Sequence, residues 1–158
     1  FLVNDKKLIN LTGFVPDEEY IIELGKGRYM RRGTDVTLVG MSYTSVVCQK
    51  AAEQLAEIGI DAEVIDMMSL SPFDEDILIE SVAKTNNVVI VDEDTPRASM
   101  SSEFAAIIAD KAFDHLDAPV KRVTSPHSPV PYNSALEQAF MPQPADVVGT
   151  VKNLLGRE

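Results

Sequence analysis

The chain has 158 residues, of which 45% are apolar, so it is long enough to bury one hydrophobic core. Its 25 acidic and 14 basic residues give a net charge of −11, which opposes binding to nucleic acid. No apolar run approaches the ~20 residues that span a membrane, and the single cysteine, Cys48, excludes an internal disulfide. We therefore expect one soluble domain from a reducing, cytoplasmic compartment, with Cys48 as a small buried hydrophobe.

The first 19 residues show neither helical nor strand periodicity. The chain starts on the apolar triplet Phe1-Leu-Val3, whereas natural termini are usually polar, so we expect a piece of a longer protein. We interpret residues 1–19 as a linker from an upstream domain and residues 20–158 as one domain. Residues 20–24 and 28–32 look extended, and the turn at 33–35 makes 28–32 an antiparallel strand before the next one.

From residue 36 onward, strand-like and helix-like segments alternate. Gly59 provides a left-handed helix stop, and Ser71-Pro72 is typical of a helix start. We expect strands at 36–41, 62–66, 87–91 and 120–124, and helices at 45–58, from Ser71 onward, 102–116, 134–140 and 145–155. Short connections between such segments predict an α/β fold. Its form is a three-layer α/β/α sandwich around a sheet of about five strands, mostly parallel with one antiparallel strand.

The search for chemical motifs yields few candidates. The sequence contains neither a glycine-rich dinucleotide motif nor a Walker-type phosphate loop, and its two histidines and one cysteine do not form a zinc motif. The turn at 40–45 has amides that would suit an anion, although such turns more often cap the following helix. His115 sits where a helix C-terminus favours a cation, so we interpret it as a capping residue.

Two loops follow strands at the edge where parallel sheets place their ligand sites. Asp92, Glu93 and Asp94 follow the most apolar strand, and carboxylates suit Mg²⁺. His127 lies in a loop stiffened by three prolines, where it would serve an interface or act as an acid–base group. The interface role is favoured because no second titratable residue lies near it in the sequence.

From about Pro16 to Leu155 the chain resembles the C-terminal, transketolase-like domain of the beta subunit of thiamine-diphosphate-dependent 2-oxoacid and acetoin dehydrogenases. The matching segments occur in the family's order and spacing. They are 16–20, 32–37, 63–66, 70–74, 80–85, 91–93, 116–119 and 129–132. Residues 96–99 and 126–129 resemble the acetoin branch more than the pyruvate branch. The substrate stays open among acetoin, pyruvate and branched-chain 2-oxoacids.

The resemblance implies an oxidoreductase in a multienzyme complex, in which this domain carries no catalytic residue, no cofactor-binding residue and no metal ligand. Thiamine diphosphate and Mg²⁺ belong to the full enzyme, and we expect neither on this fragment. The implied partners are an alpha subunit, a second beta subunit and the acyltransferase component, and we expect the fragment to form a homodimer. Our interface candidates are Asp92, Glu93, Arg97, His127, Pro129 and Tyr132.

A second hypothesis stays open beside this one. An independent α/β domain would bind a small anion at the 40–45 turn or at the loop 92–97, since both follow strands.

Overall fold

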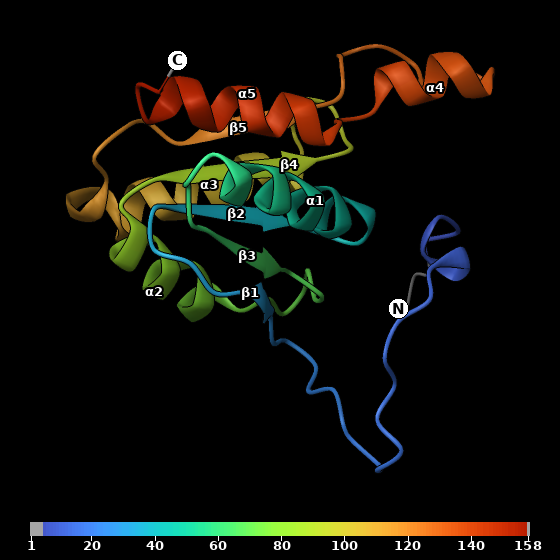
Figure 1. The fold of residues 1–158 in the computed structure, drawn as a ribbon, viewed down its shortest axis with the longest axis horizontal. Coiled ribbons are helices and arrows are strands. Elements are labelled where there is room, and N and C mark those ends of the chain that lie inside the picture. Colours follow the sequence, from blue (N-terminus) through green and yellow to red (C-terminus); the bar gives the residue numbers. More distant parts are fainter. Residues whose placement is uncertain (1–4, 158) are drawn as a thin grey trace.

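A five-stranded sheet with the strand order β1-β3-β2-β4-β5 lies at the centre of the chain (Figure 1). It is seen in a computed structural model that describes residues 5–157. The strands are β1 (Arg28–Arg31), β2 (Val36–Gly40), β3 (Ala62–Asp66), β4 (Val88–Asp92) and β5 (Lys121–Thr124). The helices are α1 (Tyr43–Glu57), α2 (Glu75–Thr85), α3 (Met100–Lys111), α4 (Ser134–Phe140) and α5 (Pro144–Leu154), with short 3₁₀ turns η1 (Leu8–Asn10) and η2 (Phe113–His115). None of the helices in this range is long and apolar enough to cross a membrane.

The pairing of the strands confirms the predicted sheet. β2 pairs in parallel with β3 and β4, β4 pairs in parallel with β5, and β1 runs antiparallel to β3 at the opposite edge. The carboxyl ends of four strands therefore meet at one edge of the sheet, which we call the carboxyl edge.

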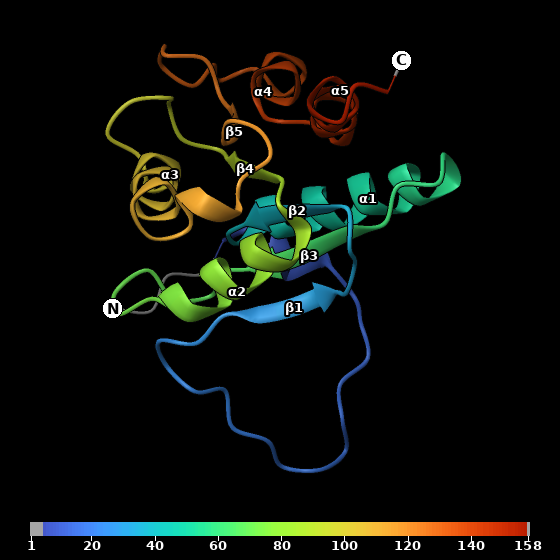
Figure 2. The same cartoon turned by 90° about the vertical axis from the view of Figure 1, so that its left-hand side faces the viewer.

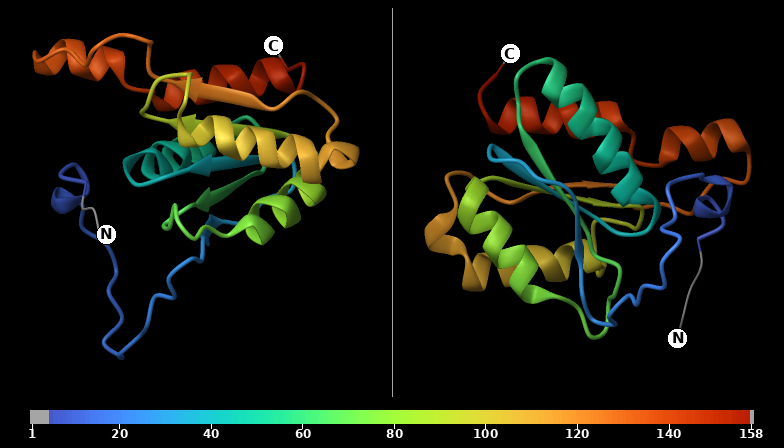
Figure 3. Two further views of the ribbon diagram at one scale, coloured as in Figure 1. Left: turned by 180° about the vertical axis from the view of Figure 1, so that it is seen from behind. Right: turned by 60° about the horizontal axis from the view of Figure 1, so that its bottom comes forward.

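Helices cover both faces of the sheet, as the apolar central strands require. In β4, Val89 and Val91 pack into a cluster with α1 and α5, while Val88 and Ile90 pack with α2 and α3 on the other face. Figure 3 shows α2 and α3 on the face away from α1 and α5, and Figure 2 shows the layers from the side. A strand buried on both faces explains the nearly unbroken apolar run at 88–91.

The start of α2 differs from the prediction. The helix begins at Glu75 with Asp74 as its N-cap, whereas Ser71 and Pro72 lie before it in a loop, joined by a cis peptide bond. Asp74 has an extended backbone, and its carboxylate accepts a hydrogen bond from the amide of Gly27 at 3.2 Å. The segment before β1 thus contacts the residue at which the helix begins.

Two other expectations are wrong. Residues 20–24 join no strand and are exposed, because the sheet ends at β1 on this side. The third helix ends at Lys111, not at residue 116, and the 3₁₀ turn η2 follows it. Phe113, which helical periodicity places on the apolar side of that helix, is consequently 69% exposed.

Glycine is required where β1 turns into β2. A Cβ atom at Gly33 would lie 2.4 Å from the carbonyl carbon of Ala62, the first residue of β3. Backbone atoms cannot yield as a flexible side chain does, so the turn passes β3 only without a side chain.

We predict that Gly33→Ala lowers the free energy of unfolding by about 1–3 kcal/mol, through overpacking against β3. Gly149→Ala is the matched control, because Gly149 lies inside α5, where an added Cβ would meet no packed neighbour within 4 Å. That change should raise stability by about 0.5–1 kcal/mol through helix propensity. Urea unfolding monitored by circular dichroism measures both, and equal effects of the two would contradict the close approach.

Candidate interface at the carboxyl edge

A hollow of about 420 Å³ opens at the carboxyl edge. Residues that follow three different strands line it: Met41 after β2, Leu70 after β3, and Glu93 and Asp94 after β4. β2 stands between β3 and β4 in the sheet, so the connections diverge here to opposite sides. Open α/β sheets place their ligand sites at such switch points.

Asp92 holds the loop that follows β4. Its carboxylate is buried, with one oxygen accepting from the amide of Asp94 at 3.1 Å and the other from the amide of Ser101 at 3.0 Å. The guanidinium of Arg122 fixes the same loop by donating to the carbonyl of Pro96 at 3.0 Å. Asp92 therefore acts as a structural clamp, which the run of three acids does not reveal.

Glu93, the next residue, is exposed at the rim of the hollow. Partial burial raises the pKa of its carboxyl group, the charges of Asp5, Asp92 and Asp94 raise it further, and Lys7 lowers it. Three negative neighbours against one positive make this rim electrostatically favourable for an added cation.

The remaining interface candidates surround this rim as exposed side chains. The loop after β5 begins beside the loop after β4, and the amide of Ser125 donates to the carbonyl of Asp94 at 3.1 Å. His127 and Pro129 are exposed in it, and Tyr132 is fully exposed. Arg97 is exposed in the neighbouring loop, and no hydrogen bond or ion pair within residues 5–157 joins it to His127. The two loops are thus adjacent, but their side chains do not converge on one point.

The turn at 40–45 uses its polar groups internally. Thr44 Oγ1 accepts from the amide of Met41 at 2.9 Å, and the amides of Thr44 and Ser45 donate to the carbonyls of Met41 and Ser42. The turn therefore caps α1, the role that helix-opening turns usually have. Cys48, further along α1, is fully buried as expected, and burial strongly raises the pKa of its thiol.

The N-terminal segment returns to this same edge. Asp5 accepts a hydrogen bond from the hydroxyl of Ser42 at 3.0 Å, and the ammonium of Lys7 lies 3.2 Å from a carboxylate oxygen of Glu137 in α4. Lys7 also lies 5.4 Å from the ring centre of Tyr43, within the range of a cation–π contact. This placement has no signal in the sequence, because nothing in residues 5–11 has a regular period.

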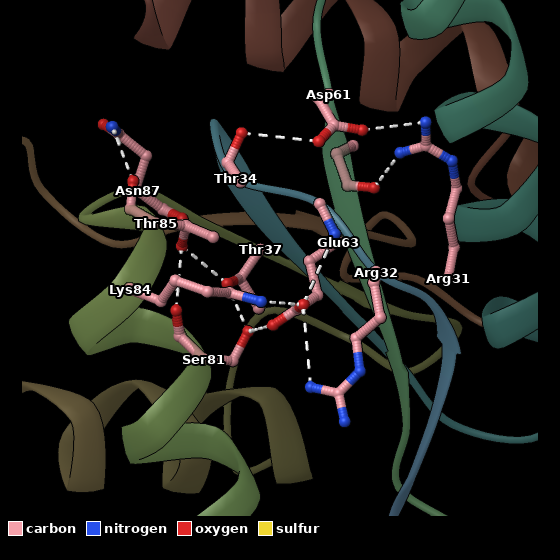
Figure 4. Close-up of polar contacts among 12 residues, drawn as sticks. Arg31, Arg32, Thr34, Thr37, Asp61, Glu63, Ser81, Lys84, Thr85 and Asn87 are labelled. Atoms are coloured by element: carbon pink, nitrogen blue, oxygen red, sulfur yellow. Dashed lines mark hydrogen bonds and ion pairs between the residues drawn. The ribbon is translucent and has the colours of Figure 1, made fainter.

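A buried carboxylate on β3 is also absent from the sequence-based candidates. Glu63 is fully buried and accepts from Ser81 of α2, while Lys84 of the same helix forms an ion pair with it (Figure 4). The amide of Gly33 lies 3.4 Å from its carboxylate, and Arg32 lies 4.0 Å away. The sequence does carry one signal for this site, because Glu63 lies within a predicted strand that helices should cover. Charged residues are rarely buried unpaired, so such an acid indicates a buried partner.

Comparison with known proteins agrees with this architecture. Residues 25–147 match the family described as the transketolase C-terminal domain. The chain belongs to that family. Among residues 5–157, this transketolase C-terminal domain holds no group of three histidine, cysteine or acidic side chains placed to bind a metal.

Two curated relatives narrow the comparison. The chain is 47% identical to the beta subunit of an acetoin:2,6-dichlorophenolindophenol oxidoreductase from Bacillus subtilis, over 99% of this chain and 46% of that protein. It is 40% identical to the mitochondrial pyruvate dehydrogenase E1 beta subunit of Dictyostelium discoideum, over 89% of this chain and 40% of that protein. The domain thus spans less than half the length of either relative.

A solved structure shows the same fold. It is a split-gene transketolase described as an inactive beta4 tetramer, 30% identical to this chain with a TM-score of 0.75. The match covers 90% of this chain and 45% of that one. The predicted transketolase-like sandwich is therefore confirmed.

We predict that Asp92→Ala lowers the free energy of unfolding by about 2–3 kcal/mol, because the buried amide of Ser101 and the partly buried amide of Asp94 lose a charged acceptor. Asp94→Ala is the control: among residues 5–157, its exposed carboxylate accepts only from the adjacent amide of Thr95, so the loss should stay under about 1 kcal/mol. Urea unfolding of both variants separates a structural clamp from a surface charge. Equal losses would show that Asp92 is no clamp.

We also predict a pH-dependent effect of Glu93→Gln. A carboxyl group whose pKa is raised by folding destabilises the fold when it is ionised, and this cost disappears as the pH falls through its folded pKa. The variant should therefore be more stable than the parent at pH 7, and the gain should vanish by about pH 4, near the ordinary glutamate pKa. Urea midpoints at several pH values test this, and a gain that grows on acidification would reverse the sign.

Proposed function

We propose that this domain is the assembly and docking part of the beta subunit of a thiamine-diphosphate-dependent dehydrogenase component, with the acetoin branch favoured over the pyruvate branch. The observation that carries this is the likeness to two named beta subunits, 47% for the acetoin enzyme of Bacillus subtilis and 40% for the pyruvate enzyme of Dictyostelium discoideum. The branch rests on the Bacillus enzyme, since the acetoin subunit of Cupriavidus necator is 36% identical. Acetoin is thus the proposed substrate of the whole enzyme.

The domain's own residues suit assembly better than chemistry. Asp92, the best-placed acid at the switch point, uses both carboxylate oxygens to accept from backbone amides, and the amides of Met41, Thr44 and Ser45 in the 40–45 turn bond within the turn. These groups do not fit a diphosphate or its Mg²⁺. We therefore assign thiamine diphosphate and its metal to other parts of the enzyme and derive no catalytic step here.

The charge of the domain supports a basic docking partner. The net charge is −11, and the rim of the hollow gathers Asp5, Glu93 and Asp94. Complementary charge raises the association rate and selects the partner. We assign this face to the acyltransferase component, next to contacts with an alpha subunit, in a cytoplasmic complex.

Exposed apolar side chains support self-association. Val130 is 64% exposed, Tyr132 fully and Leu136 60%, all in or beside the loop after β5. Exposed aromatic and aliphatic side chains that gather together mark interaction surfaces. The related split-gene structure is a tetramer of beta chains by its own description, which favours pairing of this chain as well. We propose a homodimer formed through this loop.

We predict that the chain sediments as a dimer at ~100 µM, a concentration that detects affinities of about 5 kcal/mol. Tyr132→Ser should weaken the dimer about tenfold or more, because aromatic anchors dominate such interfaces. Phe113→Ser is the control, since Phe113 is also an exposed aromatic side chain, at 69%, but lies in η2, at the other end of the sheet. A monomer at this concentration would refute the proposed pairing, and equal weakening by both variants would refute the location.

A further inference from the structure

The most exposed apolar surface of the domain lies in one segment, residues 9–24. Every residue of this segment is exposed, and more than half of the large apolar side chains that are exposed on residues 5–157 belong to it. Phe14 is 92% exposed, Ile21 91% and Leu24 84%. Apolar surface of this extent is costly to leave in water, so we expect another surface to cover it.

Both ends of the segment lie at the carboxyl edge. Before it, Asp5 accepts a hydrogen bond from the hydroxyl of Ser42, in the turn after β2. After it, Arg28 opens β1 opposite Asp66, the last residue of β3. The segment therefore leaves the carboxyl edge and returns to it. Figures 1 and 2 show this excursion on the side of β1, whereas α4 and the loop after β5 lie on the opposite side of the sheet.

The likeness to known proteins indicates what lies on the β1 side. The chain belongs to a family described as a C-terminal domain, and it spans 46% of one beta-subunit relative and 40% of the other. A C-terminal domain follows the rest of its polypeptide, so the larger part of such a subunit is joined to this domain through the residues before β1. The segment is then the surface of the domain that this larger part meets first.

The charge of the segment narrows the chemistry of its cover. It contains no lysine, arginine or histidine, and its acidic residues are Asp17, Glu18, Glu19 and Glu23. Acids flanking exposed apolar side chains are complementary to a surface with an apolar centre and a basic rim, since protein interfaces combine an apolar core with a polar rim of opposite charge.

We propose that the segment binds to the preceding half of the same subunit, on a surface that is apolar at its centre and basic at its rim. This rests on the proposed function, because it takes the domain to be part of a longer beta subunit. A cover within the same polypeptide is favoured over one on a second copy, since the linking chain gives it a high effective concentration. The carboxyl edge is then divided: its β1 side faces the chain's own subunit, while its β4–β5 side stays available for a second copy and the acyltransferase component.

Hydroxyl-radical footprinting of the complete beta subunit measures how freely water reaches each side chain. Phe14 is compared with Phe113, an aromatic side chain in η2 that is 69% exposed and lies at the other end of the sheet. An uncovered segment would react faster at Phe14, whose 92% exposure is the greater. The proposal predicts the reverse, with Phe14 oxidised about tenfold more slowly than Phe113, because the core of an interface excludes water. Equal or faster oxidation of Phe14 would overturn it.

Charge reversal tests the basic rim. Asp17→Lys/Glu18→Lys should bring the oxidation rate of Phe14 back toward that of Phe113, because like charges then repel across the contact. Glu53→Lys/Glu57→Lys is the matched control, since both acids are exposed in α1, and it should leave Phe14 protected. Equal protection of Phe14 in the two double variants would show that the rim is not basic.

Dilution identifies the cover. The subunit is diluted until sedimentation shows single copies, and the alpha subunit is left out. Protection of Phe14 should persist, since segment and cover belong to one polypeptide, and protection that appears only on pairing or on adding the alpha subunit would overturn the proposal. A subunit that pairs and binds the acyltransferase component while Phe14 stays reactive would refute the cover but leave the proposed function intact. A protected Phe14 in a subunit that binds no partner would do the opposite.

Discussion

The buried carboxylate of Glu63 is the interaction on which the other elements depend. Removing a carboxylate from water costs several kcal/mol, so the fold is stable only if the partners of this group stay in place. Those partners come from two other segments: Ser81 and Lys84 from α2, and Gly33 from the turn between β1 and β2. A second layer of hydroxyls follows, with Thr37 of β2 2.7 Å from Ser81. Displacing α2 leaves the buried charge without its close ion-pair partner, so β3 and α2 are expected to unfold together.

The same logic explains how β1 stays on the sheet. It is a short edge strand with a register shift between Tyr29 and Arg31, which hydrogen bonds alone hold weakly. Four basic residues in seven positions each approach a different acid. The pairs are Lys26 with Asp74, Arg28 with Asp66, Arg31 with Asp61 and Arg32 with Glu63. Exposed pairs contribute little each, but their spacing fixes the register. Because these bases are paired here, much of the net negative charge is left for other surfaces, including the carboxyl edge.

Local pattern in the sequence predicts much of the fold, whereas features that depend on distant contacts escape it. The sheet, its antiparallel strand and most helices follow from apolar periodicity, and Gly59 ends α1 in the left-handed region as expected. The predicted start of α2 is wrong, and Asp74, where the helix does begin, bonds to the amide of Gly27, 47 residues away, a contact that local pattern does not reveal. The predicted burial of Phe113 is wrong because a helix boundary lies two residues earlier, and boundaries are where periodicity says least. The contacts of Asp5 and Lys7 with Ser42, Tyr43 and Glu137 have no signal in the sequence at all.

At the candidate site, sequence reasoning finds the right loop but cannot distinguish its residues. Asp92, Glu93 and Asp94 are chemically alike and adjacent, yet the first is a buried clamp, the second a destabilised rim charge and the third an exposed acid whose carbonyl joins the next loop. Burial and amide partners produce that difference, and one of the two amides that bond to Asp92 comes from Ser101 in α3. A docking surface needs this arrangement, because a rim charge selects a partner only if the loop beneath it is held rigid. Asp92 makes the loop rigid, and Glu93 supplies the charge at the rim. Asp92, which the sequence suggests as a ligand-binding acid, is therefore the one least free to bind a ligand.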